Sequence, residues 1–156
     1  HDAGISCEGE IGFVGYANGD NSTGTDPEEA ARFARDSGVD AMAISCGNVH
    51  LQEDKQGGLD VARIKAIEAV TELPLVIHGG SGVPVAQRAQ LAAESRICKF
   101  NIGTELRMAF GQALRAAVTA DATRFDRVQI LRETADPVKA AAMRVISAFG
   151  APDLRT

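Results

Sequence analysis

Two histidines each follow a short apolar run that is typical of a buried strand. His50 comes after the run 39–46 and His78 after the run 75–77, and the chain has three histidines in all. Neutral imidazoles at the ends of neighbouring strands can hold a zinc ion together, and Glu10, at the end of another expected strand, could add a carboxylate. A zinc site usually takes three protein ligands and a water, so local hydrogen bonding of each histidine, or a salt bridge of Glu10, stays open as an alternative.

Two glycine-containing segments follow the last two expected strands, and the second directly precedes an amphipathic helix. Glycines let backbone N–H groups approach a phosphate closely, and the N-terminus of a helix favours an anion. Ordinary strand-to-helix turns use the same residue types. Together on consecutive strands, however, the segments fit the phosphate site that (β/α)8 barrels commonly build after their last two strands. The candidate phosphate-binding residues are Gly79, Gly80, Ser81, Asn101, Ile102, Gly103 and Thr104.

Lys99 lies two residues before Asn101, and the alternation of side chains along a strand turns both to the same face. The same alternation turns Glu8 to the face of Glu10. A lysine on this face could form a Schiff base with a carbonyl substrate. A buried ion pair between Lys99 and Glu8 is the interpretation that we favour, because Lys99 lies one layer below the strand end.

The segment from Gly12 to Thr25 is rich in Gly, Asn, Asp and Ser, and it is long enough to act as a lid over a site. Asp20 is its only carboxylate and is therefore a candidate for proton transfer. A solvated loop aspartate is the alternative, because most aspartates are exposed.

The length of 156 residues suits one domain, 1–156, without an internal boundary. The net charge of -5 argues against nucleic acid as a partner and leaves no basic surface for a membrane. No apolar run approaches the roughly 20 residues that span a bilayer. The three cysteines lie in apolar runs without CxxC spacing, which indicates buried thiols in a reducing, cytoplasmic setting.

Apolar runs and amphipathic segments alternate along the chain, and this alternation predicts an α/β fold with a parallel sheet. Each strand is followed by a helix, and two further helices are expected after the fourth unit, over 124–133 and 137–149. Four βα units are half of a TIM (β/α)8 barrel, which needs roughly 250 residues. The expected strands are 5–11, 39–46, 75–77 and 97–100, and helices are expected to begin near Asp26, Asp60 and Thr104.

Four motifs give the sequence a resemblance to the class II, metal-dependent ketose-bisphosphate aldolases, which include the fructose- and tagatose-bisphosphate aldolases. The motifs are EGEIG at 8–12, GNVH at 47–50, IHGGSG at 77–82 and CKFNIGTELRMAF at 98–110. The resemblance implies that the chain supplies the last four βα units of a (β/α)8 barrel, the fifth to the eighth, with the C-terminal helices. It also implies a homo-oligomer, a dimer or tetramer, of the full barrel.

The resemblance also implies the chemistry of the site. His50 and His78 match two of the three histidines that hold zinc, and Glu10 matches a carboxylate that binds zinc or a second cation. The glycine-containing segments match those that bind the phosphate and hydroxyls of dihydroxyacetone phosphate. The implied reaction is reversible aldol cleavage of a ketose phosphate or bisphosphate, in which zinc acts as a Lewis acid and carboxylates move protons.

Some family features depart from the pattern here. The third zinc histidine and the main catalytic aspartate are expected upstream of this chain, so the 156 residues by themselves are expected to be inactive. Asn18 stands where the family carries the acid of its loop, and Leu51 where it carries a glycine. Two alternatives therefore stay open: a phosphate-binding barrel with a binding or regulatory role, and an aldolase or lyase for another phosphorylated sugar.

Overall fold

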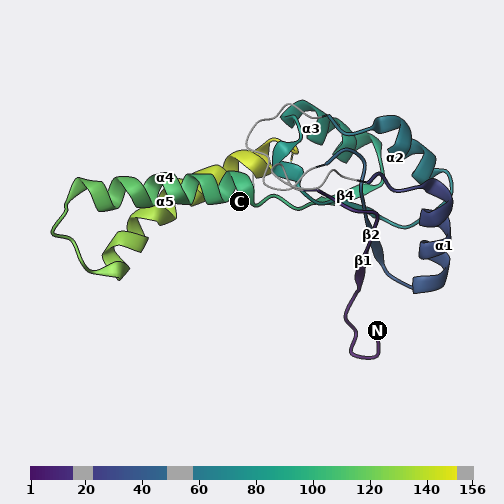
Figure 1. Ribbon diagram of the computed structural model, residues 1–156, viewed down its shortest axis with the longest axis horizontal. Coiled ribbons are helices and arrows are strands. Elements are labelled where there is room, and N and C mark those ends of the chain that lie inside the picture. The colour runs from purple at the N-terminus through teal and green to yellow at the C-terminus, as the bar shows by residue number, and fades with distance from the viewer. Residues whose placement is uncertain (16–22, 49–57, 151–156) are drawn as a thin grey trace. The chain divides into compact units, whose positions relative to one another are not determined.

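The computed structural model describes residues 1–15, 23–48 and 58–150 of the chain (Figure 1). Of the candidate site residues, His50 and Asp20 lie outside the described residues, as do Asn18 and Leu51. The contacts divide the chain into two units, 1–102 and 103–156, and each unit is described by itself. The expected single domain therefore stays a prediction.

The first unit contains a four-stranded parallel sheet in the order β1-β2-β3-β4, with each strand beside its neighbour in sequence. This arrangement follows from the connections, because each strand is joined to the next by a crossover that contains a helix. All four expected strands are present, although the first and second are shorter than expected. The elements are β1 (Glu8–Ile11), α1 (Pro27–Ser37), β2 (Ala41–Ile44), α2 (Val61–Glu68), β3 (Leu75–Ile77), the short 3-10 helix η1 (Gly80–Gly82), α3 (Val85–Glu94) and β4 (Ile97–Phe100).

Helix α1 begins and ends at the residues that its sequence indicates. The Asp26 side chain accepts hydrogen bonds from the backbone N–H groups of Glu28 and Glu29, at 2.9 and 3.1 Å. Pro27 occupies the first turn, where its missing N–H costs nothing. Gly38 ends the helix with a φ of 69°, a left-handed conformation that glycine adopts without strain.

Helix α2 confirms its expected cap but only part of its expected apolar face. The Asp60 side chain accepts a hydrogen bond from the Arg63 N–H at 2.9 Å, and Ile64 and Ile67 are fully buried. Val61 and Val70, expected on the same face, are 37% and 44% exposed. The reason is the length of the helix, since its eight residues end at Glu68 and place only the central turn against the sheet.

The two faces of the sheet differ in character. One face packs against the helices and forms the hydrophobic core, in which Met42, Ile44 and Leu75 are fully buried. Gly9 is on this face of β1, and a Cβ atom there would lie 2.7 Å from the Phe33 ring of α1. By alternation, Glu8 and Glu10 are on the opposite face, where both are exposed.

The second unit consists of two helices, α4 (Thr104–Ala120) and α5 (Arg127–Ser147), that pack against each other. Helix α4 begins at Thr104, as expected. The expected break before Pro137 is wrong, because α5 continues through this residue as one helix of 21 residues. Proline costs an interior helix about 3 kcal/mol, which the packing of α5 along α4 can offset.

Two further expectations concern the thiols and the membrane. All three cysteines are free, but only Cys46 is buried, so the expected burial of Cys7 and Cys98 is wrong. Cys7 precedes the edge strand β1, and Cys98 lies where the pairing of β4 is irregular, so the core covers neither. In the part of the chain that the structure describes, no helix is long and apolar enough to cross a membrane.

Candidate functional site

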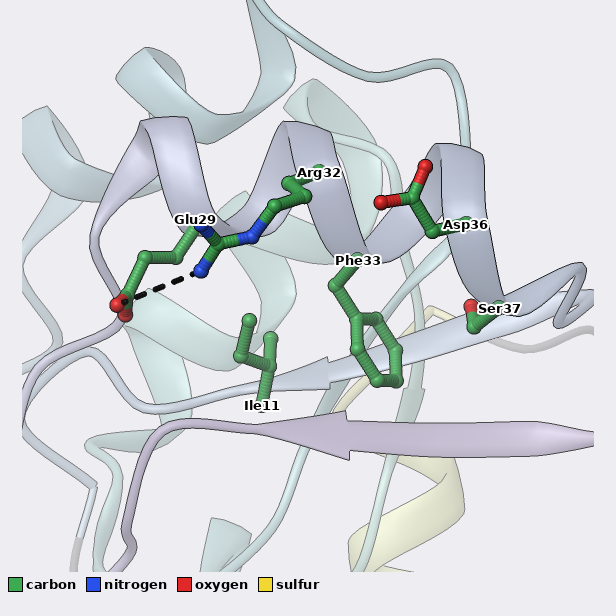
Figure 2. A pocket seen from close by; sticks show the side chains of 6 residues that line it. All are labelled: Ile11, Glu29, Arg32, Phe33, Asp36 and Ser37. Atoms are coloured by element: carbon green, nitrogen blue, oxygen red, sulfur yellow. Dashed lines mark ion pairs between the residues drawn. The ribbon is translucent and has the colours of Figure 1, made fainter.

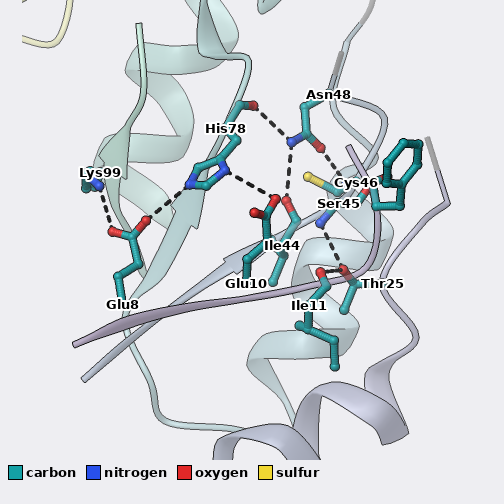
Figure 3. Close-up of polar contacts among 11 residues, drawn as sticks. Glu8, Glu10, Ile11, Thr25, Ile44, Ser45, Cys46, Asn48, His78 and Lys99 are labelled. Carbon is teal, nitrogen blue, oxygen red and sulfur yellow. Dashed lines mark hydrogen bonds and ion pairs between the residues drawn. The ribbon is translucent and has the colours of Figure 1, made fainter. Parts of the chain in front are cut away.

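His78 lies directly after β3 and contacts two carboxylates of β1 (Figure 3). Its Nε2 atom is 3.1 Å from Oε1 of Glu8, and its Nδ1 atom is 3.2 Å from Oε1 of Glu10. Strand β2 lies between β1 and β3, and the residue that it places beside Glu10 is Ala43. Because alanine has a small side chain, the imidazole can reach across β2 to both acids.

Lys99 completes this polar cluster from β4. Its Nζ atom lies 2.6 Å from Oε2 of Glu8, so the two oxygens of Glu8 contact different partners. The hydrogen bond from Lys99 is the main cause that lowers the pKa of Glu8; burial opposes it and the contact with His78 adds to it. The expected pair of Lys99 and Glu8 is confirmed, but its expected burial is wrong, because the Lys99 side chain is 50% exposed.

An irregularity in strand pairing gives Lys99 its position. Leu75 pairs with Ile97, whereas the next residue, Val76, pairs with Lys99, so β4 contains one extra residue. Ile97 packs into the helix-covered core, while Lys99 reaches Glu8 on the other face. Without this bulge, Ile97 and Lys99, which are two positions apart, would point to the same face of the sheet.

Asn48 fixes the backbone of His78. It is 2% exposed, and its Nδ2 atom donates to the carbonyl oxygens of His78 and Ile44, at 2.9 and 3.3 Å. Its Oδ1 atom accepts from the N–H of Cys46 at 2.7 Å. Reasoning from the sequence missed this role, although Asn48 belongs to the GNVH motif and asparagine is suited to bridging two backbone segments.

A second group of hydrogen bonds joins the end of β1 to the end of β2. The Thr25 hydroxyl donates to the Ile11 carbonyl at 2.8 Å and accepts from the Ser45 N–H at 2.9 Å. The Ser45 hydroxyl donates to the carbonyl of Phe13 at 3.0 Å. These bonds hold both flanks of the segment that contains Asp20.

The expected phosphate-binding segments meet where β3 and β4 end. The N–H of Gly80 donates to the Asn101 carbonyl at 3.0 Å, and the N–H of Asn101 donates to Ile77 at 2.8 Å. Gly79 has a φ of 64°, and a Cβ atom on Gly80 would lie 3.2 Å from the Asn101 oxygen, so both positions favour glycine. Ser81 is buried in the 3-10 turn that follows.

The remaining candidate phosphate-binding residues belong to different units of the chain. Ile102 is the last residue of the first unit, whereas Gly103 and Thr104 open the second unit. Gly103 precedes α4 and provides no side-chain cap for its N-terminal N–H groups. Phosphate binding by these residues stays a prediction.

The donor atoms around His78 are of the kind that zinc prefers, an imidazole nitrogen beside a carboxylate oxygen. Among the described residues there is no group of three or more His, Cys, Asp and Glu side chains that could hold a metal ion. The third donor named by the sequence, His50, lies outside these residues. His78 and Glu10 therefore fit a zinc site in chemical type, as two of its ligands.

A surface pocket of about 330 Å³ lies on the helix-covered side of β1 (Figure 2). Its charged residues include Arg32 and Glu29, whose Nη2 and Oε1 atoms are 3.9 Å apart. It contains none of the candidate site residues, and its charges neutralise each other in part. The pocket is lined by Ile11, Glu29, Arg32, Phe33, Asp36 and Ser37.

Comparison with known families and proteins shows which family the chain resembles. Residues 1–153 match the family model for fructose-bisphosphate aldolase class-II. The chain is 32% identical over 154 residues to a fructose-bisphosphate aldolase of Geobacillus stearothermophilus, and the match covers 96% of this chain and 53% of that protein.

Solved structures show the same relationship in three dimensions. The crystal structure of the YdjI aldolase from Escherichia coli K12 is 31% identical, with a TM-score of 0.69, over 96% of this chain and 50% of that one. A structure from Coccidioides immitis has a TM-score of 0.72 at 19% identity, over 94% of this chain and 53% of that one, which supports the fold alone. The chain thus spans about half the length of these relatives. Its four parallel βα units match half of the (β/α)8 barrel, which confirms the expected fold class.

Proposed function

Because the chain belongs to the class-II fructose-bisphosphate aldolase family, we propose that it forms part of the active site of a metal-dependent aldolase. The proposed substrate is a ketose phosphate or bisphosphate, which is cleaved reversibly to dihydroxyacetone phosphate and an aldehyde. The observation that carries the proposal is the position of His78, which lies between two carboxylates where β3 ends. Family membership supports aldolase chemistry in general, and the metal and the substrate are parts of this proposal.

His78 and Glu10 would hold Zn²⁺ together with His50, and a second cation, monovalent or divalent, would share Glu10. The bound metal supplies a Lewis acid that polarises the ketone carbonyl. Two contacts within the chain would hold His78 in position to bind the metal. Asn48 holds the His78 backbone through the carbonyl oxygen, and Glu8 contacts the ring nitrogen that is remote from Glu10.

The phosphate of the substrate would bind at Gly79, Gly80 and Ser81, with Asn101 and Ile102 beside them. The left-handed turn at Gly79 supports this assignment, since a glycine there leaves the backbone open to an anion. Gly103 and Thr104 would contribute N–H groups at the start of α4, where the helix dipole favours an anion. Asp20 would move a proton of the substrate hydroxyl.

The proposal is tested by metal analysis and by an assay of aldol cleavage on the full-length protein. His78→Ala is expected to lose bound zinc and cleavage of fructose and tagatose 1,6-bisphosphates. His1→Ala is the matched control, because His1 is an exposed histidine that pairs with Asp40, at 2.8 Å. A wild-type protein that binds no divalent metal, or a His78→Ala variant with unchanged activity, would contradict the proposal.

The alternative of a phosphate-binding barrel without aldolase activity is favoured by one observation, the amide of Asn18 in the loop position where the family carries an acid. The same assay separates the two functions. A protein that binds dihydroxyacetone phosphate and zinc but cleaves none of a panel of ketose phosphates would support the alternative.

A further inference from the structure

The two ring nitrogens of His78 face two different carboxylates, at nearly equal distances of 3.1 and 3.2 Å (Figure 3). A neutral imidazole carries one N–H, so it can donate a hydrogen bond to only one of them. The other nitrogen then turns its lone pair toward a carboxylate oxygen, and two electron-rich atoms face each other. Which carboxylate receives the N–H therefore decides which nitrogen offers its lone pair.

Glu8 and Glu10 differ in what else holds them. The second oxygen of Glu8 is 2.6 Å from the Lys99 ammonium, which keeps this carboxylate charged and fixes its plane. The Glu8 side chain is also less exposed than that of Glu10, 29% against 43%. Glu8 is thus the better oriented acceptor, while Glu10 has no second ion pair among the described residues to hold it.

We propose that Glu8 is a positioning residue for His78: it accepts the Nε2–H of the imidazole and so leaves the Nδ1 lone pair as the donor atom beside Glu10. Lys99 serves the same arrangement, because it holds Glu8 from the far side. This inference rests on the proposed function, since the lone pair on Nδ1 and the Glu10 oxygen together form the half-site that a cation would occupy.

The chemistry of metal sites gives the arrangement its purpose. An imidazole ligand commonly donates its second N–H to a carboxylate, which fixes the tautomer and raises the basicity of the ligating nitrogen. Loss of such a partner typically weakens metal affinity about 10- to 100-fold. Lys99 then has the role of holding Glu8 in place, and this role needs no covalent bond to a substrate.

The first measurement is the tautomer of His78 in metal-free full-length protein, from the ¹⁵N and ¹³C chemical shifts of its ring. The spectra are recorded in the pH range in which the two ring nitrogens show the distinct shifts of a neutral imidazole. The wild type is expected to show Nε2–H. Glu8→Ala is expected to lose this preference, and Glu8→Gln to keep part of it, because the amide oxygen still accepts a hydrogen bond.

Two control variants separate positioning from a general structural effect. Glu94→Ala removes an exposed carboxylate of α3 that accepts a hydrogen bond from Gln90, and it should leave the tautomer unchanged. Glu10→Gln should also keep Nε2–H, because the proposed acceptor is intact. The result that overturns the inference is a wild-type ring with Nδ1–H, or a tautomer that responds to Glu10→Gln and not to Glu8→Ala.

The second measurement is zinc affinity, determined by competition with a chelator. Glu8→Ala is expected to bind zinc about 10- to 100-fold more weakly than the wild type, with Glu8→Gln between them. Unchanged affinity in a folded Glu8→Ala protein would overturn the inference. A wild type that shows Nε2–H but binds no zinc would overturn the proposed function, while it would support the orientation of His78 by Glu8.

Discussion

The side-chain amide of Asn48 donates a hydrogen bond of 2.9 Å to the backbone carbonyl of His78, and this bond joins the end of β2 to the end of β3. The two residues are 30 positions apart in sequence. The same amide also contacts the backbone of Cys46 and Ile44. Asn48 is therefore a buried residue whose hydrogen bonds connect the segment after β2 with the backbone of His78.

Asn48→Ala is expected to lower the free energy of unfolding by about 1–3 kcal/mol, because it leaves buried backbone donors and acceptors without partners. Gln90→Ala removes an exposed amide that bonds to the exposed Glu94, so it should cost less than about 0.5 kcal/mol. Urea denaturation of both variants measures the difference. Equal stability of the two variants would show that the bonds of Asn48 contribute nothing.

Gly80→Ala is expected to destabilise the protein by about 1–3 kcal/mol, the usual cost of overpacking a closed site. The new Cβ atom would lie 3.2 Å from the Asn101 oxygen and 3.3 Å from a carbon of Ile102, and backbone cannot move aside as a flexible side chain can. Gly111→Ala is the matched control in α4, where the Cβ atom meets only the end of Arg115, at 3.4 Å.

The control should raise stability by about 0.5–1 kcal/mol, because alanine favours a helix over glycine. Thermal unfolding of both variants is the measurement. A Gly80→Ala protein as stable as the wild type, with unchanged affinity for inorganic phosphate, would contradict the close packing of this turn.

Cys46 is expected to resist alkylation in the native protein across the pH range in which ordinary thiols react. Burial raises its pKa to about 12, and the negative charge of Asp60 adds to this effect. Since the thiolate is the reactive form, a change from pH 7 to pH 9 should leave native Cys46 nearly unmodified.

Exposed Cys98, in β4, is the internal control and should react with iodoacetamide in the native protein. Mass spectrometry of the alkylated protein, with and without urea, gives the extent of reaction at each thiol. Modification of Cys46 at the rate of Cys98 without urea would be inconsistent with its burial.

Pro137→Ala is expected to stabilise α5 by about 1–3 kcal/mol. Pro137 is exposed within the helix, so its replacement costs no core contact and restores the missing hydrogen bond to the preceding turn. Urea denaturation and far-ultraviolet circular dichroism follow the change. A loss of stability would contradict this expectation.

Much of the fold follows from local features of the sequence. Asp26 and Asp60 cap the helices that they precede, Gly38 ends α1, and the apolar runs became four parallel strands. Capping, glycine turns and the period of apolar residues depend on a few neighbouring residues, and these can be inferred without a three-dimensional structure. The pairing of Glu8 with Lys99 also followed from alternation on strands that had been correctly placed.

The features that the sequence did not predict depend on contacts between distant segments. Pro137 would break an isolated helix, yet packing along α4 keeps α5 continuous. The irregular pairing at Leu75 and Val76 lets Ile97 pack into the core while Lys99 lies on the other face, and such a bulge is a property of two strands together. Asn48 received no role from the sequence, because only the fold brings the His78 carbonyl to its side-chain amide.

By itself, therefore, the sequence determined the element order, the strand ends that carry polar residues and the types of ligand that they offer. Only the tertiary structure decided how these groups meet: His78 between Glu8 and Glu10, with Lys99 on the far side of Glu8. The physical reason is that the type of a residue defines the donor atoms that it offers, and the alternation along a strand defines the face on which it lies. The partner of that donor is set by strand register and by the small side chain of Ala43, over which the imidazole reaches.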